Sequence, residues 1–138
     1  MNHELIIPCS KNSLKDIRQF VESTLTGFCV PEMEISMIVL AVDEICANRI
    51  IHSNKNNDKL SLRLKIMDAE DGLSFEIMDR GAPFDHNNHE DPSLQSLKEQ
   101  KRKGGLGLML VKRIMDSIEV TTENNYTVCR LYKKVSVC

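Results

Sequence analysis

Hydrophobic residues recur at helical spacing in two stretches of the first third of the chain. Ser13 and Asp16 are spaced as in a helix-start box, and apolar side chains then follow every three or four residues to Phe28, which predicts an amphipathic helix. Pro31 suits the first turn of a second helix, because its missing N–H is harmless there. We expect that helix to run to about His52 and, being apolar on most sides, to be largely buried.

Alternation of apolar and polar residues predicts strands in much of the remaining chain. Asp71-Gly72 and Asn124-Asn125 are the expected turns of two hairpins, and a third apolar helix is expected from Gly104 through Met115. The expected strands cover residues 4–9, 60–66, 73–77, 118–122 and 126–135. Such hairpins predict a two-layer α/β (α+β) sandwich, a mixed, mostly antiparallel sheet with helices on one face.

Length and charge narrow the possible functions. A chain of 138 residues fits one domain, residues 1–138, with a core of its own. The 18 lysines and arginines against 20 aspartates and glutamates give a net charge of −2, which argues against direct nucleic-acid binding. With no apolar run near the roughly 18 residues of a membrane span and no signal-like start, we expect a cytoplasmic protein that does not bind a membrane.

The cysteine pattern does not indicate a disulfide framework or a metal site. The five of them are odd in number, scattered, and never arranged as Cys-x-x-Cys, which argues against a disulfide scaffold or a zinc cluster. We expect them to be reduced and mostly in or near the core.

A polar stripe crosses the second helix. Glu44, Asn48 and His52 are spaced four residues apart, so they share one face. An unpaired carboxylate inside a protein is costly, so Glu44 borders either a wet cleft with a ligand or a solvated helix edge. His52 fits a helix-end hydrogen-bonding role better than a ligand role. Arg49, on the same helix, needs a carboxylate if buried, such as Asp43 or one from a partner.

Two further segments have residues suited to binding a nucleotide. Asp79 follows a strand and precedes Gly81. This arrangement can present a carboxylate acceptor at the strand end, and the glycine can let a flat ligand approach the backbone. A simple turn after a strand has the same pattern. The glycines at 104, 105 and 107 precede a helix, where backbone amides can bind phosphates, unless they serve only loop flexibility. Neither a dinucleotide fingerprint nor a Walker loop is present.

Together the three motifs resemble, in order, those of the anti-sigma-factor serine/threonine kinases. These belong to the superfamily of gyrase, heat-shock chaperone, histidine-kinase and mismatch-repair (GHKL) ATPases, which have the Bergerat, histidine-kinase-like fold. The resemblance covers nearly the whole chain; Pro83 stands where many superfamily members have a second glycine. The matching residues are Glu44-x-x-x-Asn48-x-x-x-His52, Asp79-Arg80-Gly81-Ala82-Pro83-Phe84-Asp85 and Gly104-Gly105-Leu106-Gly107-Leu108, with Val111 and Met115-Asp116.

The resemblance implies a role for each motif. Glu44 would be the general base, Asn48 would hold Mg²⁺, and Asp79 would accept the adenine amino group of ATP. It further implies nucleotide contacts from Gly81, Phe84, Lys103, Gly104, Gly105, Leu106 and Gly107. The implied function is an ATP-dependent serine/threonine kinase that phosphorylates an anti-anti-sigma partner with a STAS domain and sequesters a sigma factor, commonly as a homodimer.

Two other functions remain open at this stage. One is a regulatory binding module that binds ATP or ADP and transfers nothing. The other is ATP hydrolysis for its own sake, with water in place of the serine hydroxyl.

Overall fold

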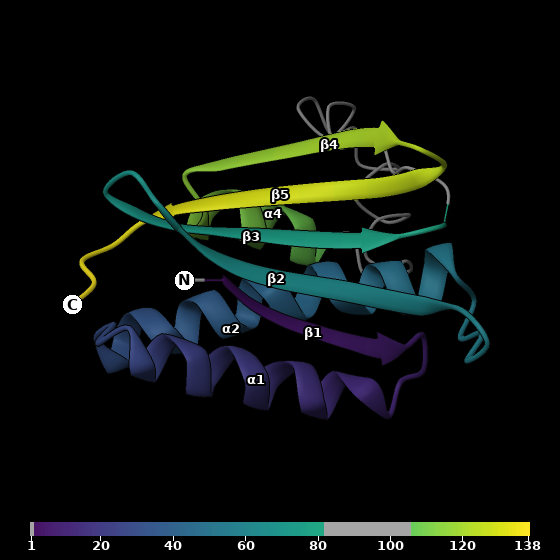
Figure 1. Ribbon diagram of the computed structural model, residues 1–138, viewed down its shortest axis with the longest axis horizontal. Coiled ribbons are helices and arrows are strands. Elements are labelled where there is room, and N and C mark those ends of the chain that lie inside the picture. The colour runs from purple at the N-terminus through teal and green to yellow at the C-terminus, as the bar shows by residue number, and fades with distance from the viewer. Residues whose placement is uncertain (1, 82–105) are drawn as a thin grey trace.

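The computed structural model describes residues 2–81 and 106–138, and the side chain of Leu106 lies outside that description. The strands are β1 (Asn2–Pro8), β2 (Ser61–Ala69), β3 (Gly72–Asp79), β4 (Ser117–Glu123) and β5 (Tyr126–Lys134) (Figure 1). The helices are α1 (Ser13–Gly27), α2 (Glu32–Ala47) and α4 (Leu106–Ile114), and a short π-helix, η1 (Asn48–Ser53), continues α2.

The five strands form one sheet in the order β1-β2-β3-β5-β4, and every pairing is antiparallel. Both expected hairpins are present. Asn124 and Asn125 have φ of 51° and 71°, the two positive values that a tight hairpin turn favours. In the other hairpin the turn residues are Glu70 and Asp71, so Gly72 is the first residue of β3 and not part of the turn.

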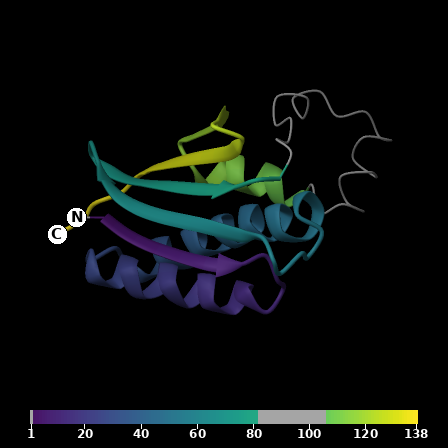
Figure 2. The same cartoon turned by 45° about the vertical axis from the view of Figure 1, so that its right-hand side comes forward.

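The helices cover one face of the sheet, and Figure 2 shows the two layers from the side. Alternate residues of β2 and β3 point into the core between the layers and are fully buried; they are Leu62, Leu64, Ile66, Leu73, Phe75 and Ile77. The opposite face is polar, with Arg130 of β5 paired to Glu76 of β3 at 3.1 Å. This arrangement confirms the expected two-layer α+β fold with helices on one face.

The second helix differs from expectation at its C-terminal end. A regular α-helix was expected to reach about His52, but from Asn48 the chain winds as a π-helix. The Asn54 N–H donates to the Arg49 carbonyl at 2.9 Å, and the Asn54 side-chain amide donates to the same carbonyl at 2.7 Å. π-Helical turns inside helices are frequent at functional sites. Here the turn brings Asn54 against the Arg49 carbonyl.

Two smaller expectations are wrong. The helix-start box does not form, because Asn12 occupies the N-cap position and no side chain caps α1. The cysteines are not all reduced, because Cys29 and Cys138 form a disulfide that ties the C-terminal segment to the α1–α2 connection. Their sequence separation of 109 residues hides the pairing from any spacing rule. The remaining three cysteines are free and buried, as expected.

Within residues 2–81 and 106–138, no helix is both long enough and apolar enough to cross a membrane.

Candidate nucleotide site

The first and third motifs meet where α2 passes the N-terminal end of α4. A Cβ atom placed on Gly107 would overlap the carboxylate of Glu44. Gly107 therefore permits an approach that no other residue type would allow, and it places the backbone of the first turn of α4 directly against the acid of α2. Residues 63 positions apart in sequence are thus brought together, as the shared site requires.

Glu44 lies half-buried on α2. Burial raises the pKa of its carboxyl above the ordinary value, and the negative charge of the adjacent Asp43 raises it further. Asp43 itself faces away and pairs with Arg18 of α1 at 3.0 Å. A carboxylate whose pKa is raised by its surroundings is a stronger proton acceptor once ionised, which suits a general base.

Asn48 lies one turn beyond Glu44, half-buried, where α2 ends and η1 begins. His52, the last member of the expected stripe, is exposed. In the part of the chain that the structure describes, no group of three or more His, Cys, Asp or Glu residues could hold a metal ion.

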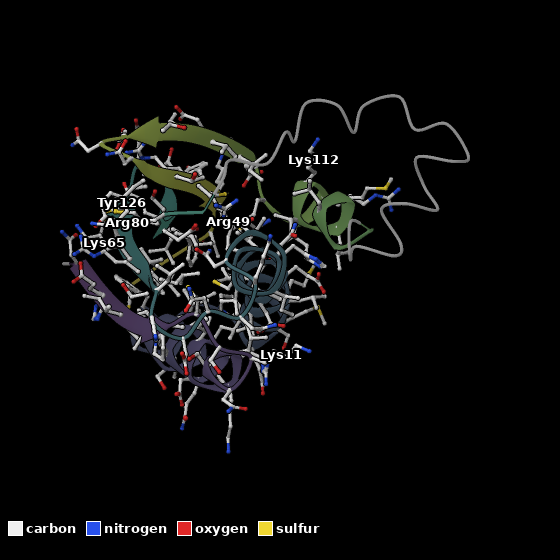
Figure 3. All side chains as sticks on the ribbon, turned by 90° about the vertical axis from the view of Figure 1, so that its right-hand side faces the viewer. Lys11, Arg49, Lys65, Arg80, Lys112 and Tyr126 are labelled. Atoms are coloured by element: carbon white, nitrogen blue, oxygen red, sulfur yellow. A yellow bond between two sulfur atoms is a disulfide. The ribbon has the colours of Figure 1, made fainter. Side chains whose placement is uncertain are left out.

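Asp79, at the end of β3, makes a buried ion pair with Arg49. Arg49 Nε donates to Asp79 Oδ2 at 2.7 Å and Arg49 Nη2 donates to Asp79 Oδ1 at 2.8 Å. The two side chains are 1% and 0% exposed. Figure 3, which looks at the structure from the end where β3 finishes, shows Arg49 inside the protein between α2 and the sheet. The carboxylate that Arg49 needs is therefore Asp79, and the expectation of Asp43 is wrong.

Two more donors complete the surroundings of Asp79. Asn54 Nδ2 donates to Oδ1 at 3.0 Å, and the Gly81 N–H donates to the same oxygen at 2.7 Å. A Cβ on Gly81 would lie 2.9 Å from Asp79 Oδ1 and 3.1 Å from Arg49 Nη2. In this conformation Gly81 thus allows the chain to close over the ion pair, and the space beside it is filled by protein.

Three thiols lie near this cluster. The pKa of Cys9 is raised to about 11, chiefly by burial and also by the charge of Asp79, while Arg49 acts in the opposite direction. Burial raises the pKa of Cys129 to about 12 and that of Cys46 well above its ordinary value. These cysteines stay protonated at neutral pH, so they act as small apolar core residues.

Several expected site residues lie outside the described residues: Phe84, Lys103, Gly104 and Gly105. Leu106 begins α4, but its side chain is not described. Among the residues that are described, Glu44 and Gly107 come together, while Asp79 and Gly81 join Arg49 and Asn54. Sequence reasoning missed Asn54, because it is one of four asparagines between Asn48 and Asn57 and nothing local distinguishes it.

Arg80 is a second residue whose contact was not expected. It follows Asp79 but points to the other side, where its guanidinium carbon lies 5.0 Å from the centre of the Tyr126 ring. Its Nη2 also donates to the Tyr126 hydroxyl at 3.1 Å, and Figure 3 shows the two side by side. Together with the Thr127 hydroxyl, which donates to the Gly81 carbonyl at 2.7 Å, this contact fixes the chain that leaves β3.

The fold and the motifs agree with what comparisons of the chain show. The histidine kinase-like ATPase domain family matches residues 7–133. The serine-protein kinase RsbW of Bacillus pumilus is 27% identical over 131 residues, covering 91% of this chain and 81% of that protein. The anti-sigma F factor of Clostridium beijerinckii is 29% identical over 105 residues, covering 75% of this chain and 73% of that protein.

Two solved structures share the fold. One is the crystal structure of the RsbU and RsbW domains of a Mycobacterium tuberculosis protein, with a TM-score of 0.70 at 14% identity. The match includes 98% of this chain but only 32% of the longer Mycobacterium chain. The other is the SiaB–SiaC complex from Pseudomonas aeruginosa, with a TM-score of 0.67 at 15% identity, covering 94% of this chain and 88% of that chain. The resemblance to anti-sigma-factor kinases is confirmed, and the chain belongs to the histidine kinase-like ATPase domain family.

Proposed function

We propose that this protein is an ATP-dependent serine/threonine kinase that phosphorylates an anti-anti-sigma partner of the STAS type and sequesters a sigma factor. The observation that carries the proposal is the contact between the Glu44 carboxylate and Gly107 at the start of α4. It places a candidate base beside a helix N-terminus, where phosphate groups bind favourably. The relatives named serine-protein kinase RsbW and anti-sigma F factor support the same function.

In this proposal Glu44 accepts the proton of the partner's serine hydroxyl as that oxygen becomes the nucleophile. Mg-ATP, when bound, would supply the γ-phosphoryl group, which passes to the serine oxygen as ADP leaves, and the positive charge of Mg²⁺ would neutralise the phosphates. Phosphoryl transfer depends mainly on positioning and on electrostatic stabilisation, and a positioned base contributes about 10²- to 10⁴-fold. Burial, which raises the pKa of Glu44, strengthens that base.

Asn48 would hold the magnesium ion through its side-chain oxygen. Its place one helical turn from Glu44 puts both residues on the side of α2 that faces the start of α4. A single amide ligand is consistent with Mg²⁺, which keeps several waters and binds phosphates through few protein groups. The contacts expected from Phe84, Lys103, Gly104 and Gly105 remain predictions.

The experiment that tests the proposal is phosphate transfer to a purified STAS-type partner, followed by intact-mass spectrometry of that partner. Glu44→Gln keeps the size of the side chain but removes the base, and we expect at least a hundredfold slower transfer. Glu32→Gln, in the first turn of the same helix, is the matched control and should behave as wild type. Equal transfer by Glu44→Gln and wild type would remove Glu44 from the mechanism.

One observation favours a second candidate, a regulatory module that binds partners without transferring phosphate. The family resemblance assigns Asp79 to the adenine ring of ATP, but the Asp79 carboxylate is fully buried against Arg49. Sequestration of a sigma factor by wild-type protein, combined with no transfer to any STAS-type partner, would support this second function over the first.

A further inference from the structure

The carboxylate of Asp79 has almost no capacity left for another donor. It accepts four hydrogen bonds, from Arg49 Nε, Arg49 Nη2, Asn54 Nδ2 and the Gly81 N–H. A carboxylate offers about four lone-pair sites. Three of the four bonds fall on Oδ1, and the fourth, from Arg49 Nε at 2.7 Å, takes Oδ2. Oδ1 therefore has no site left, and an amino group that donated to Oδ2 would have to fit beside the Arg49 guanidinium.

The packing around the ion pair closes this remaining site to a ligand. Asp79 and Arg49 are each 0% exposed as whole residues, and Gly81 packs so closely that even a methyl group there would lie 3.1 Å from Arg49 Nη2. Of the four donors, the Arg49 guanidinium is a long side chain that can leave by rotating. The Gly81 N–H is backbone two residues away, and the Asn54 amide also binds the Arg49 carbonyl at 2.7 Å.

The position of Arg49 is built into the fold. It lies in the π-helical segment η1, and its guanidinium binds the carboxylate at the end of β3. The Asn54 amide joins the two ends of the cluster, because it donates to the Arg49 carbonyl and to Asp79 Oδ1. Asp79 at the end of β3 and Asn54 directly after η1 thus hold Arg49 in this position.

We propose that Arg49 competes with the adenine amino group for Asp79 and so sets the affinity and base selectivity of the nucleotide site. This inference rests on the proposed function, since it concerns the same site. Only the fraction of molecules in which Arg49 has left Asp79 can bind adenine, and the apparent dissociation constant rises as that fraction falls. Wild-type protein therefore binds ATP weakly, and removing the competitor tightens binding.

The test is calorimetry of ATP and GTP binding, with Mg²⁺, to wild type, Arg49→Ala and a matched control. The control is Arg18→Ala, which removes an arginine paired at the surface with Asp43. We expect Arg49→Ala to bind ATP at least about tenfold more tightly than wild type, a change of about 1.4 kcal/mol. GTP should gain nothing, because guanine carries an oxygen where adenine carries its amino group. Arg18→Ala should match wild type for both nucleotides.

The outcomes separate this inference from the proposed function. Equal ATP affinity in wild type and Arg49→Ala would overturn the competition and leave the proposed function standing. An equal gain in GTP affinity would also overturn it, because Arg49 would then block the site sterically and would not compete with adenine for the Asp79 carboxylate. No nucleotide binding by either folded protein would overturn both proposals.

A second variant and a wild-type measurement guard against misfolding of Arg49→Ala. Arg49→Gln keeps one amide donor for Asp79 and loses the other, so its gain in ATP affinity should be smaller but in the same direction. In wild type, the NMR signal of the Arg49 Nε–H should shift or vanish as ATP saturates the protein. An unchanged Arg49 signal at saturation would contradict displacement.

Discussion

Removing the charge of Asp79 should destabilise the protein severely. Asp79→Asn is nearly isosteric, so it leaves no cavity, and the new amide's oxygen can still accept from the Gly81 N–H. What is lost is the acceptor for Arg49 Nε, now 2.7 Å from Asp79 Oδ2, and the negative charge that balances a guanidinium with 1% exposure. Breaking a buried ion pair by neutralising one partner costs about 3–5 kcal/mol.

That loss is large compared with the total stability of a domain, about 5–15 kcal/mol. The assay is urea unfolding followed by far-UV circular dichroism, with the free energy of unfolding extrapolated to water. The melting temperature should fall by roughly 10–20 °C. Asp43→Asn is the matched control, because it also neutralises an aspartate paired with an arginine at 3.0 Å. In this pair the side chains of Arg18 and Asp43 are 47% and 22% exposed. Such exposed pairs contribute only about 0–1 kcal/mol to stability.

A cost for Asp79→Asn no larger than that for Asp43→Asn would refute the reasoning, because Arg49 would then not depend on Asp79. The double variant Arg49→Met/Asp79→Asn sharpens the result. It removes both charges, and apolar replacement of a buried pair is often neutral or stabilising. We expect it to recover most of the stability lost in Asp79→Asn, with a coupling energy of at least about 1.5 kcal/mol in a double-mutant cycle.

Two further predictions concern the contact between Glu44 and α4. Burial raises the folded-state pKa of Glu44, so the native protein keeps the carboxyl proton to a higher pH than the unfolded chain does, and the free energy of unfolding falls as pH rises through that range. Urea unfolding should therefore show Glu44→Gln to be more stable than wild type at pH 7. The difference should disappear below the carboxyl's ordinary pKa of 4.5. Gly107→Ala should cost about 1–3 kcal/mol of stability, since its Cβ would overlap the Glu44 carboxylate, and it should slow transfer to the partner in the mass-spectrometric assay; a variant with wild-type stability and transfer would contradict this contact.

The sheet and the helices follow from the sequence because their signals are local. Alternation along 61–69 and 72–79 places Leu62, Leu64, Phe75 and Ile77 on the buried face, and period-two patterning needs no knowledge of distant partners. Antiparallel pairing follows from short turns, as at Asn124-Asn125. The expected strand boundaries agree with the structure to within three residues.

The ion pair and the disulfide could not be predicted in the same way, because both join residues that are remote in sequence. Arg49 and Asp79 are 30 residues apart and lie on different elements, η1 and β3. The sequence signal that does exist is a charged residue on an otherwise buried helix, which requires a carboxylate. It cannot say whether that carboxylate is Asp43 or Asp79.

The candidate site was predictable as a set of motifs but not as a working arrangement. The resemblance assigns Glu44 and Gly107 to one nucleotide site, and the structure places the two residues in contact. The same resemblance assigns Asp79 to adenine, whereas the structure gives its carboxylate to Arg49. Competition between a ligand and a side chain for one acceptor depends on distances below 3 Å, which no spacing pattern encodes.

The most direct test of the account is calorimetry of ATP binding with and without Mg²⁺, comparing wild type with Asn48→Ala. We expect weak, magnesium-dependent binding by wild type and loss of the magnesium-dependent part in the variant, because one of few protein ligands to the ion is removed. Binding by wild type that does not depend on magnesium, or that Asn48→Ala leaves unchanged, would contradict the metal role of Asn48. Absence of ATP binding in wild type and in Arg49→Ala alike would contradict the nucleotide site itself.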